Sequence, residues 1–144
     1  MTKKPQYVLN VEGVANWKID LAAGFTTLGL SDRRKGAFSK LDKGDVLITY
    51  VTGTGFVDLR QIEVRGVEPV VTESNYPMGT FPWRVRTRLI VSAGLDRALS
   101  PHDFPQTSLC AGDWRYRFRQ SGRLLDAADG RLISQAVHAA AKRR

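Results

Sequence analysis

The chain has 144 residues, which fits one domain over 1–144, and its 42% hydrophobic content excludes a disordered chain of low hydrophobicity. Lysine and arginine number 22 against 14 for aspartate and glutamate, so the net charge of +8 favours nucleic acid as a partner. The single cysteine excludes an intramolecular disulfide and favours a cytoplasmic protein, and no run of about 20 apolar residues predicts a membrane span.

Short extended and helical segments open the chain. Residues 7–11 (YVLNV) predict a buried strand. Residues 14–23 predict a short helix with Trp17 and Leu21 on its apolar face, because these side chains recur at helical spacing. Residues 26–31 predict a second short extended segment, which a basic run follows.

A hairpin is predicted in the middle of the chain. Residues 37–41 indicate a helical turn, and residues 46–51 (VLITYV) form the clearest strand. The glycine-flanked turn 53–55 connects this strand to a returning strand over 56–64. The chain then continues as an antiparallel neighbour through 67–71.

Proline and glycine mark an irregular loop over 77–82, and residues 83–91 then predict a long strand. Side chains alternate along a strand, so its arginines share one face and Trp83 lies on the other. Residues 101–104 predict a short capped helix. Residues 114–118 (WRYRF) alternate again and predict another strand.

Asp126 begins a predicted terminal helix over 126–141, with an apolar stripe at helical spacing. In total the sequence predicts about six strands, a few short helices and one C-terminal helix. Strands that follow each other closely and turn on glycines favour an α+β fold with a small, bent antiparallel or mixed β-barrel. The regular strand–helix alternation of a doubly wound fold is missing.

The sequence contains no recognisable catalytic or metal-ligating constellation. His102 and His138 lie in unrelated segments, and one cysteine leaves no Cys/His cluster. A nucleophile elbow, a phosphate-binding glycine loop and an H-E-x-x-H motif are all missing. A carboxylate pair such as Asp32 with Asp58 is what any chain of this length offers. We therefore expect no catalytic residue, no metal and no cofactor.

Arginines and aromatic residues are interleaved between positions 81 and 123. Every cation in this segment is arginine, whose planar fork suits phosphates and base edges. Aromatic faces stack on unpaired or flipped bases, and the candidates here are Phe81, Trp83, Trp114, Tyr116 and Phe118. The alternative is that these aromatic residues face the core while the arginines face water.

The order of these motifs resembles an EVE domain, a prokaryotic member of the PUA-like superfamily related to the YTH readers. Residues 41–50 (LDKGDVLITY) resemble the family's "kpGD.v..Y" strand, and residues 81–86 (FPWRVR) resemble its "yPyRv.v" strand. The remaining matches are residues 7–17, 28–38, 56–64 and 114–121 with the terminal helix. The resemblance therefore covers nearly the whole chain.

The resemblance implies a bent β-barrel with a pocket that takes a base, possibly modified, of RNA or of modified DNA. The pocket wall that it implies consists of Asn10, Asn16, Trp17, Leu28, Gly29, Leu30, Ser31, Tyr50, Phe56, Trp83 and Trp114. The phosphate-binding residues are expected to be Arg33, Arg34, Lys35, Arg84 and Arg119. Arg119 falls where the YTH relatives place a phosphate-binding arginine.

One departure from the family concerns the modified base. The family often has Trp-Gly-Val where this chain has Leu28-Gly29-Leu30, so one aromatic wall of the pocket is missing. One of the three tryptophans of the chain would have to replace it.

The leading interpretation is a non-enzymatic nucleic-acid-binding module. One alternative is a small hydrolase of the related ASCH type, acting on a modified nucleoside. The Gly-x-Lys-x-x-Glu-x-Arg pattern of those enzymes is absent, because residues 29–34 (GLSDRR) carry neither the lysine nor the glutamate. The other alternative is a protein-interaction module, which an exposed apolar patch without a basic rim would favour.

Overall fold

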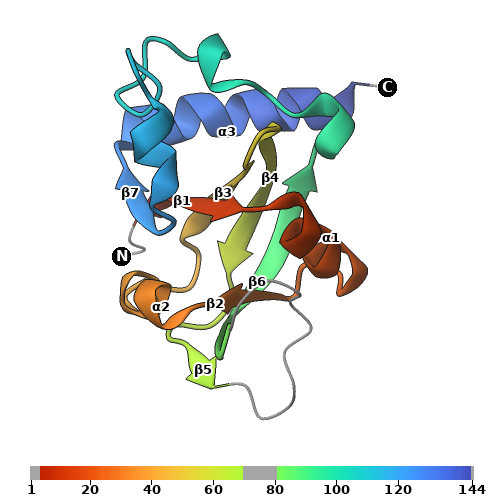
Figure 1. Cartoon of the computed structure of the whole chain (residues 1–144), viewed down its shortest axis with the longest axis vertical. Coiled ribbons are helices and arrows are strands. Elements are labelled where there is room, and N and C mark those ends of the chain that lie inside the picture. The colour runs from red at the N-terminus through yellow and green to blue at the C-terminus, as the bar shows by residue number, and fades with distance from the viewer. Residues whose placement is uncertain (1–3, 70–80, 144) are drawn as a thin grey trace.

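The computed structural model describes residues 4–69 and 81–143. A curled mixed sheet forms the centre of the fold, and the long C-terminal helix α3 lies across one end of it (Figure 1). The helices are α1 (Val14–Ala22), α2 (Asp32–Ser39) and α3 (Ala127–Lys142). The strands are β1 (Tyr7–Glu12), β2 (Thr27–Leu30), β3 (Val46–Val51), β4 (Gly55–Ile62), β5 (Glu68–Pro69), β6 (Trp83–Ser92) and β7 (Arg123–Leu125).

The strands follow the order β2-β6-β4-β3-β1-β7, and the short β5 pairs with β6 outside this path. β1 runs parallel to β3, whereas the other pairs are antiparallel. The register shifts between Thr49 and Tyr50 in β3 and between Leu59 and Arg60 in β4. Such irregularities increase the local twist and bend of a sheet, which explains the curl.

β2 and β7 occupy opposite ends of this strand order, although β1 and β2 are consecutive strands in the chain. The helix α1 connects them and carries the chain from one side of the curled sheet to the other. We call the space between β2 and the β1–β7 pair the seam. Backbone and side chains from two parts of the sheet that do not pair meet in the seam.

The main core lies between the sheet and α3, where Leu9, Phe56, Ile133 and Val137 are buried. Gly130 in α3 packs so closely on Tyr7 that a Cβ atom there would collide with the tyrosine ring. A second core cluster around Phe38 and Leu47 fills the space beneath α2, and a third around Trp17 and Phe25 lies beneath α1.

The strands predicted over 7–11, 46–51, 56–64 and 83–91 and the terminal helix are present, with small differences at their ends. The α+β class with a bent mixed sheet is confirmed. Part of the predicted segment 67–71 and most of the loop 77–82 lie outside the described residues. Among the helices that the structure describes, none is long and apolar enough to cross a membrane.

The strand predicted over 114–118 is wrong, because Arg115–Arg119 form a 3₁₀ helix. Trp114 and Phe118 are four residues apart, and their rings pack edge-to-face. Tyr116, between them in sequence, is 56% exposed. The guanidinium of Arg117 donates to the carbonyl oxygens of Leu109 and Ala111, which holds the turn in place. The five residues fitted both the two-residue alternation of a strand and the four-residue spacing of a helix, and they form the helical structure.

Two smaller expectations also changed. Leu21, predicted on the buried face of α1, is 51% exposed, and Asp20 is buried in its place. Asp126 stands at the N-cap position of α3, but its side chain makes no capping hydrogen bond. It accepts instead from the hydroxyl of Ser108, whose backbone N–H donates to Asp129.

Candidate functional site

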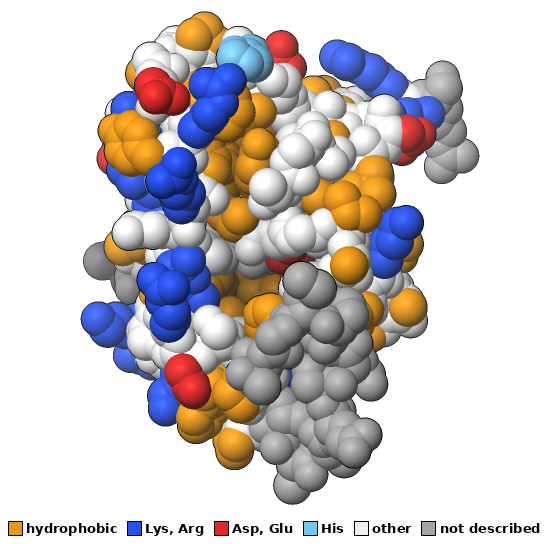
Figure 2. Space-filling model, in the orientation of Figure 1, with side chains coloured by type: hydrophobic (Ala, Val, Ile, Leu, Met, Phe, Trp, Pro, Cys, Tyr) orange, Lys and Arg blue, Asp and Glu red, His pale blue; other side chains and the backbone are white. Residues whose placement is uncertain are grey.

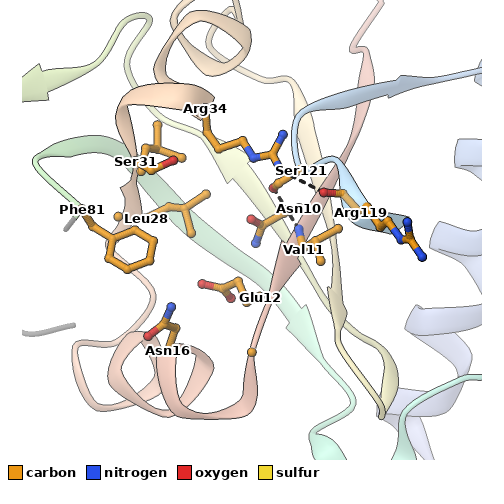
Figure 3. A pocket seen from close by; sticks show the side chains of 13 residues that line it. Asn10, Val11, Glu12, Asn16, Leu28, Ser31, Arg34, Phe81, Arg119 and Ser121 are labelled. Carbon is orange, nitrogen blue, oxygen red and sulfur yellow. Dashed lines mark hydrogen bonds between the residues drawn. The ribbon is translucent and has the colours of Figure 1, made fainter. Parts of the chain in front are cut away.

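A cavity of about 190 Å³ lies in the seam. Figure 3 shows side chains from β1, α1, β2 and α2 converging on it, together with residues from just before β6 and β7. Its walls are residues 10–13, Asn16, residues 28–31, Arg34, Phe81, Arg119 and Ser121. The cavity therefore exists because the sheet curls until its two edges face each other without pairing.

One wall of the cavity carries amide side chains. Asn10 is 1% exposed and donates from Nδ2 to Thr49 Oγ1 on the neighbouring strand, at 3.1 Å. Asn16 lies at the start of α1, and its buried Oδ1 has no hydrogen-bond partner among the described residues. A buried polar atom without a partner is costly, so Asn16 Oδ1 is suited to accept a hydrogen bond from a ligand.

The opposite wall carries arginines. Arg34 in α2 donates from Nη2 to the carbonyl oxygen of Arg119, at 2.8 Å, and this bond crosses the seam (Figure 3). Ser121 Oγ accepts from the backbone N–H of Val11, at 2.9 Å, which fixes the chain beside β1. Partial burial and the neighbouring Arg33 charge lower the pKa of Arg34, although a guanidinium keeps its charge in proteins.

A buried charge cluster lies behind the amide wall. Arg60 in β4 is fully buried and donates to three carboxylates, with N···O distances of 2.9 Å to Glu12, 2.9 Å to Asp20 and 3.0 Å to Asp58. Trp17 Nε1 donates to the same Asp58, at 2.8 Å. The three carboxylates are drawn from β1, α1 and β4, so the cluster joins these elements.

Glu12 belongs to both the cluster and the cavity wall. Burial raises the pKa of this carboxyl well above 4.5, a hydrogen bond with Asp20 raises it further, and Arg60 opposes both effects. The cavity thus has amide side chains and a carboxyl of raised pKa along one part of its wall, and arginines along another.

No protein-family model matches this sequence, and no curated protein matches it either. Solved structures do match in three dimensions. The YTH domain of the Zygosaccharomyces rouxii MRB1 protein, in complex with N6-methyladenosine RNA, superimposes with a TM-score of 0.68. It is 10% identical, and the match covers 94% of this chain and 88% of that one. The fold is that of a YTH domain.

Two further solved structures share the fold. A hypothetical protein from Leishmania major is 19% identical, with a TM-score of 0.68 and coverage of 94% of this chain and 96% of that one. A protein from Rhodopseudomonas palustris is 16% identical, with a TM-score of 0.60 and coverage of 93% and 94%. At these identities the likeness shows the fold alone, so the site must be argued from this chain's own residues.

Eight residues expected at the site line the cavity of this YTH-type fold. They come from β1, β2 and the helical segments that follow or flank these strands. They are Asn10, Asn16, Leu28, Gly29, Leu30, Ser31, Arg34 and Arg119.

Three expected wall residues lie in the core instead. Tyr50 and Phe56 pack on each other and on Phe118, on the side of the sheet that α3 covers. Trp17 is 4% exposed, packs against Phe25 and turns its N–H toward Asp58, behind the cavity wall. These aromatic side chains fill the interior, which leaves them no surface toward the cavity.

The other two tryptophans lie outside the cavity. Trp83 is covered by the Lys35 ammonium, 3.7 Å from the ring centroid, and donates from Nε1 to Asp32 at 2.7 Å. Trp114 packs edge-to-face on His102 and Phe118. Phe81 is therefore the one aromatic residue among the described residues that line the cavity. None of the three tryptophans expected in the pocket wall lines this cavity.

The remaining expected phosphate-binding residues surround the site without lining it. Arg33 and Lys35 lie on α2 beside Arg34. Arg84 donates to the carbonyl oxygens of Phe81 and Trp83, so it supports the strand that enters β6. Figure 2 shows Lys and Arg side chains in a column along one side of a face that is hollowed at its centre.

Sequence reasoning missed five lining residues, namely Val11, Glu12, Gly13, Phe81 as a wall residue, and Ser121. Glu12 could have been found, because it is the last residue of the buried strand that contains Asn10. Asp58 and Arg60 were a second indication in the sequence, in this case of a buried charge cluster. Opposite charges two residues apart in an apolar strand share one face and require buried partners.

Proposed function

We propose that this domain binds single-stranded or locally opened nucleic acid by taking one base into the seam cavity, with arginines on the flanking phosphates. The observation that carries the proposal is a cavity lined by two arginines and by an amide oxygen of Asn16 that has no partner within residues 4–69 and 81–143. The YTH-type fold agrees with it, since one protein of that fold was solved with N6-methyladenosine RNA. The proposed ligand is either RNA or modified DNA.

The size and chemistry of the cavity fit a single planar heterocycle. Leu28, Leu30 and Phe81 offer apolar contact for ring faces, while Asn16 offers an acceptor for a ring edge. Pockets for small ligands commonly combine an apolar lining with a few well-placed polar groups. Proteins that read a single base hold it out of the stack in such a pocket.

The charge around the cavity fits a phosphate backbone. The chain carries a net +8, and Arg33, Arg34, Lys35 and Arg119 lie on the two elements that border the cavity. Neutralising phosphates releases counterions, so binding should weaken steeply as salt increases.

Fluorescence anisotropy with short labelled single-stranded RNA and DNA, at a series of salt concentrations, tests this proposal. Arg119→Ala should weaken binding to every sequence and reduce the salt slope by about one, because one phosphate contact is lost. Arg131→Ala is the matched control, since it removes an exposed arginine of α3 that does not line the cavity. Absence of binding to every oligonucleotide at low salt would overturn the proposal.

The cavity itself is tested by Ser31→Phe in the same assay. Ser31 lines the cavity and precedes α2, but its side chain makes no capping hydrogen bond, so the substitution should leave the helix intact. A phenyl group there should block entry of a base and leave the salt-dependent phosphate contacts. We expect the variant to lose discrimination between oligonucleotides that differ in one base, while keeping salt-sensitive binding.

One observation favours the hydrolase alternative. Glu12 is a cavity carboxyl whose pKa is raised by burial, and general acids often have this property. We nevertheless propose binding without turnover, because Glu12 is held by Arg60 as part of a structural cluster. Incubation with an N-acylated cytidine, followed by chromatography, should show no product, and steady release of cytidine would favour the enzyme.

A further inference from the structure

A short turn beside the seam exposes an aromatic ring. Arg115–Arg119 form the 3₁₀ helix that precedes β7, and Tyr116 in it is the one aromatic residue among the large exposed hydrophobic residues that the structure describes. The neighbouring rings are occupied, since Phe118 is buried and Trp114 packs on it and on His102. Tyr116 is therefore the ring of this turn that offers a surface to a ligand.

The Tyr116 ring is held in place from one side. The guanidinium carbon of Arg117 lies 5.0 Å from the centroid of this ring. The same guanidinium donates to the carbonyl oxygens of Leu109 and Ala111, at 3.0 and 2.7 Å, so its own position is fixed. A cation that covers one face of an aromatic ring leaves the opposite face for a second partner. Because the ring is already held, a partner that stacks on it costs little further side-chain entropy.

The turn also connects Tyr116 to the cavity. A 3₁₀ helix has three residues per turn, so side chains three positions apart project in the same direction. Tyr116 and Arg119 are three positions apart, about 6 Å along the axis at the rise of such a helix. Arg119 lines the cavity, and in Figure 3 its guanidinium group points away from Asn10 and Leu28. A nucleic-acid strand that leaves the cavity past Arg119 would therefore meet Tyr116 next.

The charge around this turn suits a phosphate backbone. Arg115 lies over the Trp114 ring, and its ion pair with exposed Asp113 is long, at 3.6 Å. Surface pairs of this kind contribute little, so a phosphate can compete for Arg115. Proteins that bind single strands combine cations along the backbone with aromatic rings on which bases stack. The turn has both parts, with exposed arginines at 115 and 119 and a ring between them.

We propose that Tyr116 is a second nucleotide site, a stacking surface for the base adjacent to the one in the seam cavity, with the phosphate between the two bases on Arg119. This inference rests on the proposed function. The second site accepts any base, because stacking uses the ring face that all bases have. The domain then holds two consecutive nucleotides, one enclosed in the cavity and one stacked at the surface.

The test compares two labelled five-nucleotide strands by fluorescence anisotropy, each made as RNA and as DNA. One has adenine at the three central positions, and the other has a single central adenine, with abasic nucleotides at all remaining positions. Both carry the same phosphates, so the difference in affinity measures what the neighbouring bases contribute. We expect the three-adenine strand to bind the original protein between about fivefold and a hundredfold more tightly, the range for one base stacked on an aromatic ring.

Tyr116→Ala supplies the decisive variant. It should bind the three-adenine strand at least about fivefold more weakly than the original protein does. It should bind the single-adenine strand equally well, because the one base of that strand is in the cavity. Its salt dependence should not change, since tyrosine carries no charge, whereas Arg119→Ala reduces the salt slope. Tyr116→Phe keeps the ring and should bind both strands as the original protein does.

Val64→Ala is the matched control, because it removes a similarly exposed apolar side chain that does not line the cavity. It should bind both strands as the original protein does. Far-ultraviolet circular dichroism establishes that every variant is folded.

The outcomes separate the two proposals. Unchanged affinity of folded Tyr116→Ala for the three-adenine strand, equal losses for both strands, or a loss in Tyr116→Phe as large as in Tyr116→Ala overturns the stacking site. A dimer in light scattering that Tyr116→Ala abolishes would assign the ring to a contact between two copies, and it overturns the site as well. In these cases salt-sensitive binding that depends on Arg119 leaves the proposed function intact. If no strand binds at any salt concentration, both proposals fail.

Discussion

Arginine occupies both sides of the seam cavity in opposite physical settings. Arg60 is fully buried and bonded to three carboxylates. Arg119 is exposed, and Arg34 reaches across the seam to a backbone carbonyl. The buried guanidinium joins β1, α1 and β4 through their carboxylates, whereas Arg34 and Arg119 are among the residues that line the cavity. The same residue type thus builds the wall on one side and is available to a ligand on the other.

Replacing Arg60 should reduce the stability of the fold more than any other substitution considered. Arg60→Met keeps much of the volume but leaves three buried carboxyls without a counter-charge, a change that costs about 3–5 kcal/mol of unfolding free energy. Urea denaturation measures the loss, and part of it should be recovered at acidic pH, where the carboxyls are protonated. Arg65→Ala is the control, since its exposed ion pair with Asp42 is worth about 0–1 kcal/mol.

The two tryptophan N–H groups that donate to carboxylates give a second, smaller contrast. Trp17→Phe leaves buried Asp58 without one donor and should cost about 1–3 kcal/mol. Trp83→Phe removes an equivalent bond to Asp32 at the surface, where water replaces it, and should cost less than about 1 kcal/mol. Thermal unfolding of both variants measures the difference. Equal losses would contradict the distinction between the buried and exposed sides.

Glu12→Gln should have the smallest effect, visible mainly as a change with pH. A carboxyl whose pKa is raised in the folded protein stabilises the fold fully below its usual pKa of 4.5, and this contribution is lost as the pH rises through the raised value. The original protein should therefore lose stability relative to Glu12→Gln toward alkaline pH. Melting temperatures across the pH range measure it, and parallel curves would show that Glu12 does not titrate as expected.

The sheet and the terminal helix were predictable because their apolar residues repeat with clear periods. Residues 46–51 are one such case, and the stripe that includes Ile133 and Val137 is another. The same reasoning gave the wrong structure for residues 114–118. The aromatic residues at 114, 116 and 118 fit the alternation of a strand, and the pair at 114 and 118 also fits the four-residue spacing of a helix. Periodicity cannot separate the two structures over so short a segment.

The lining of the candidate site was predictable in its backbone segments and not in its aromatic residues. Asn10, Asn16 and residues 28–31 lie on segments whose order along the chain was recognisable. Whether Trp17 or Phe81 faces the cavity depends on tertiary contacts, such as the hydrogen bond that the Trp17 N–H donates to Asp58. The partners of Arg60 come from three distant segments, so no local pattern reveals the cluster.

The bond from Arg34 to the Arg119 carbonyl links α2, which follows β2, to the 3₁₀ helix that precedes β7, and β2 and β7 share no ladder. An occupant of the cavity that contacts both edges would add a second tie across the same gap. Filling the cavity would then slow the local opening of β1 and β2 as well as satisfy hydrogen bonds, and backbone amide exchange in these strands would report occupancy directly. A base bound as proposed would therefore make this part of the domain more rigid.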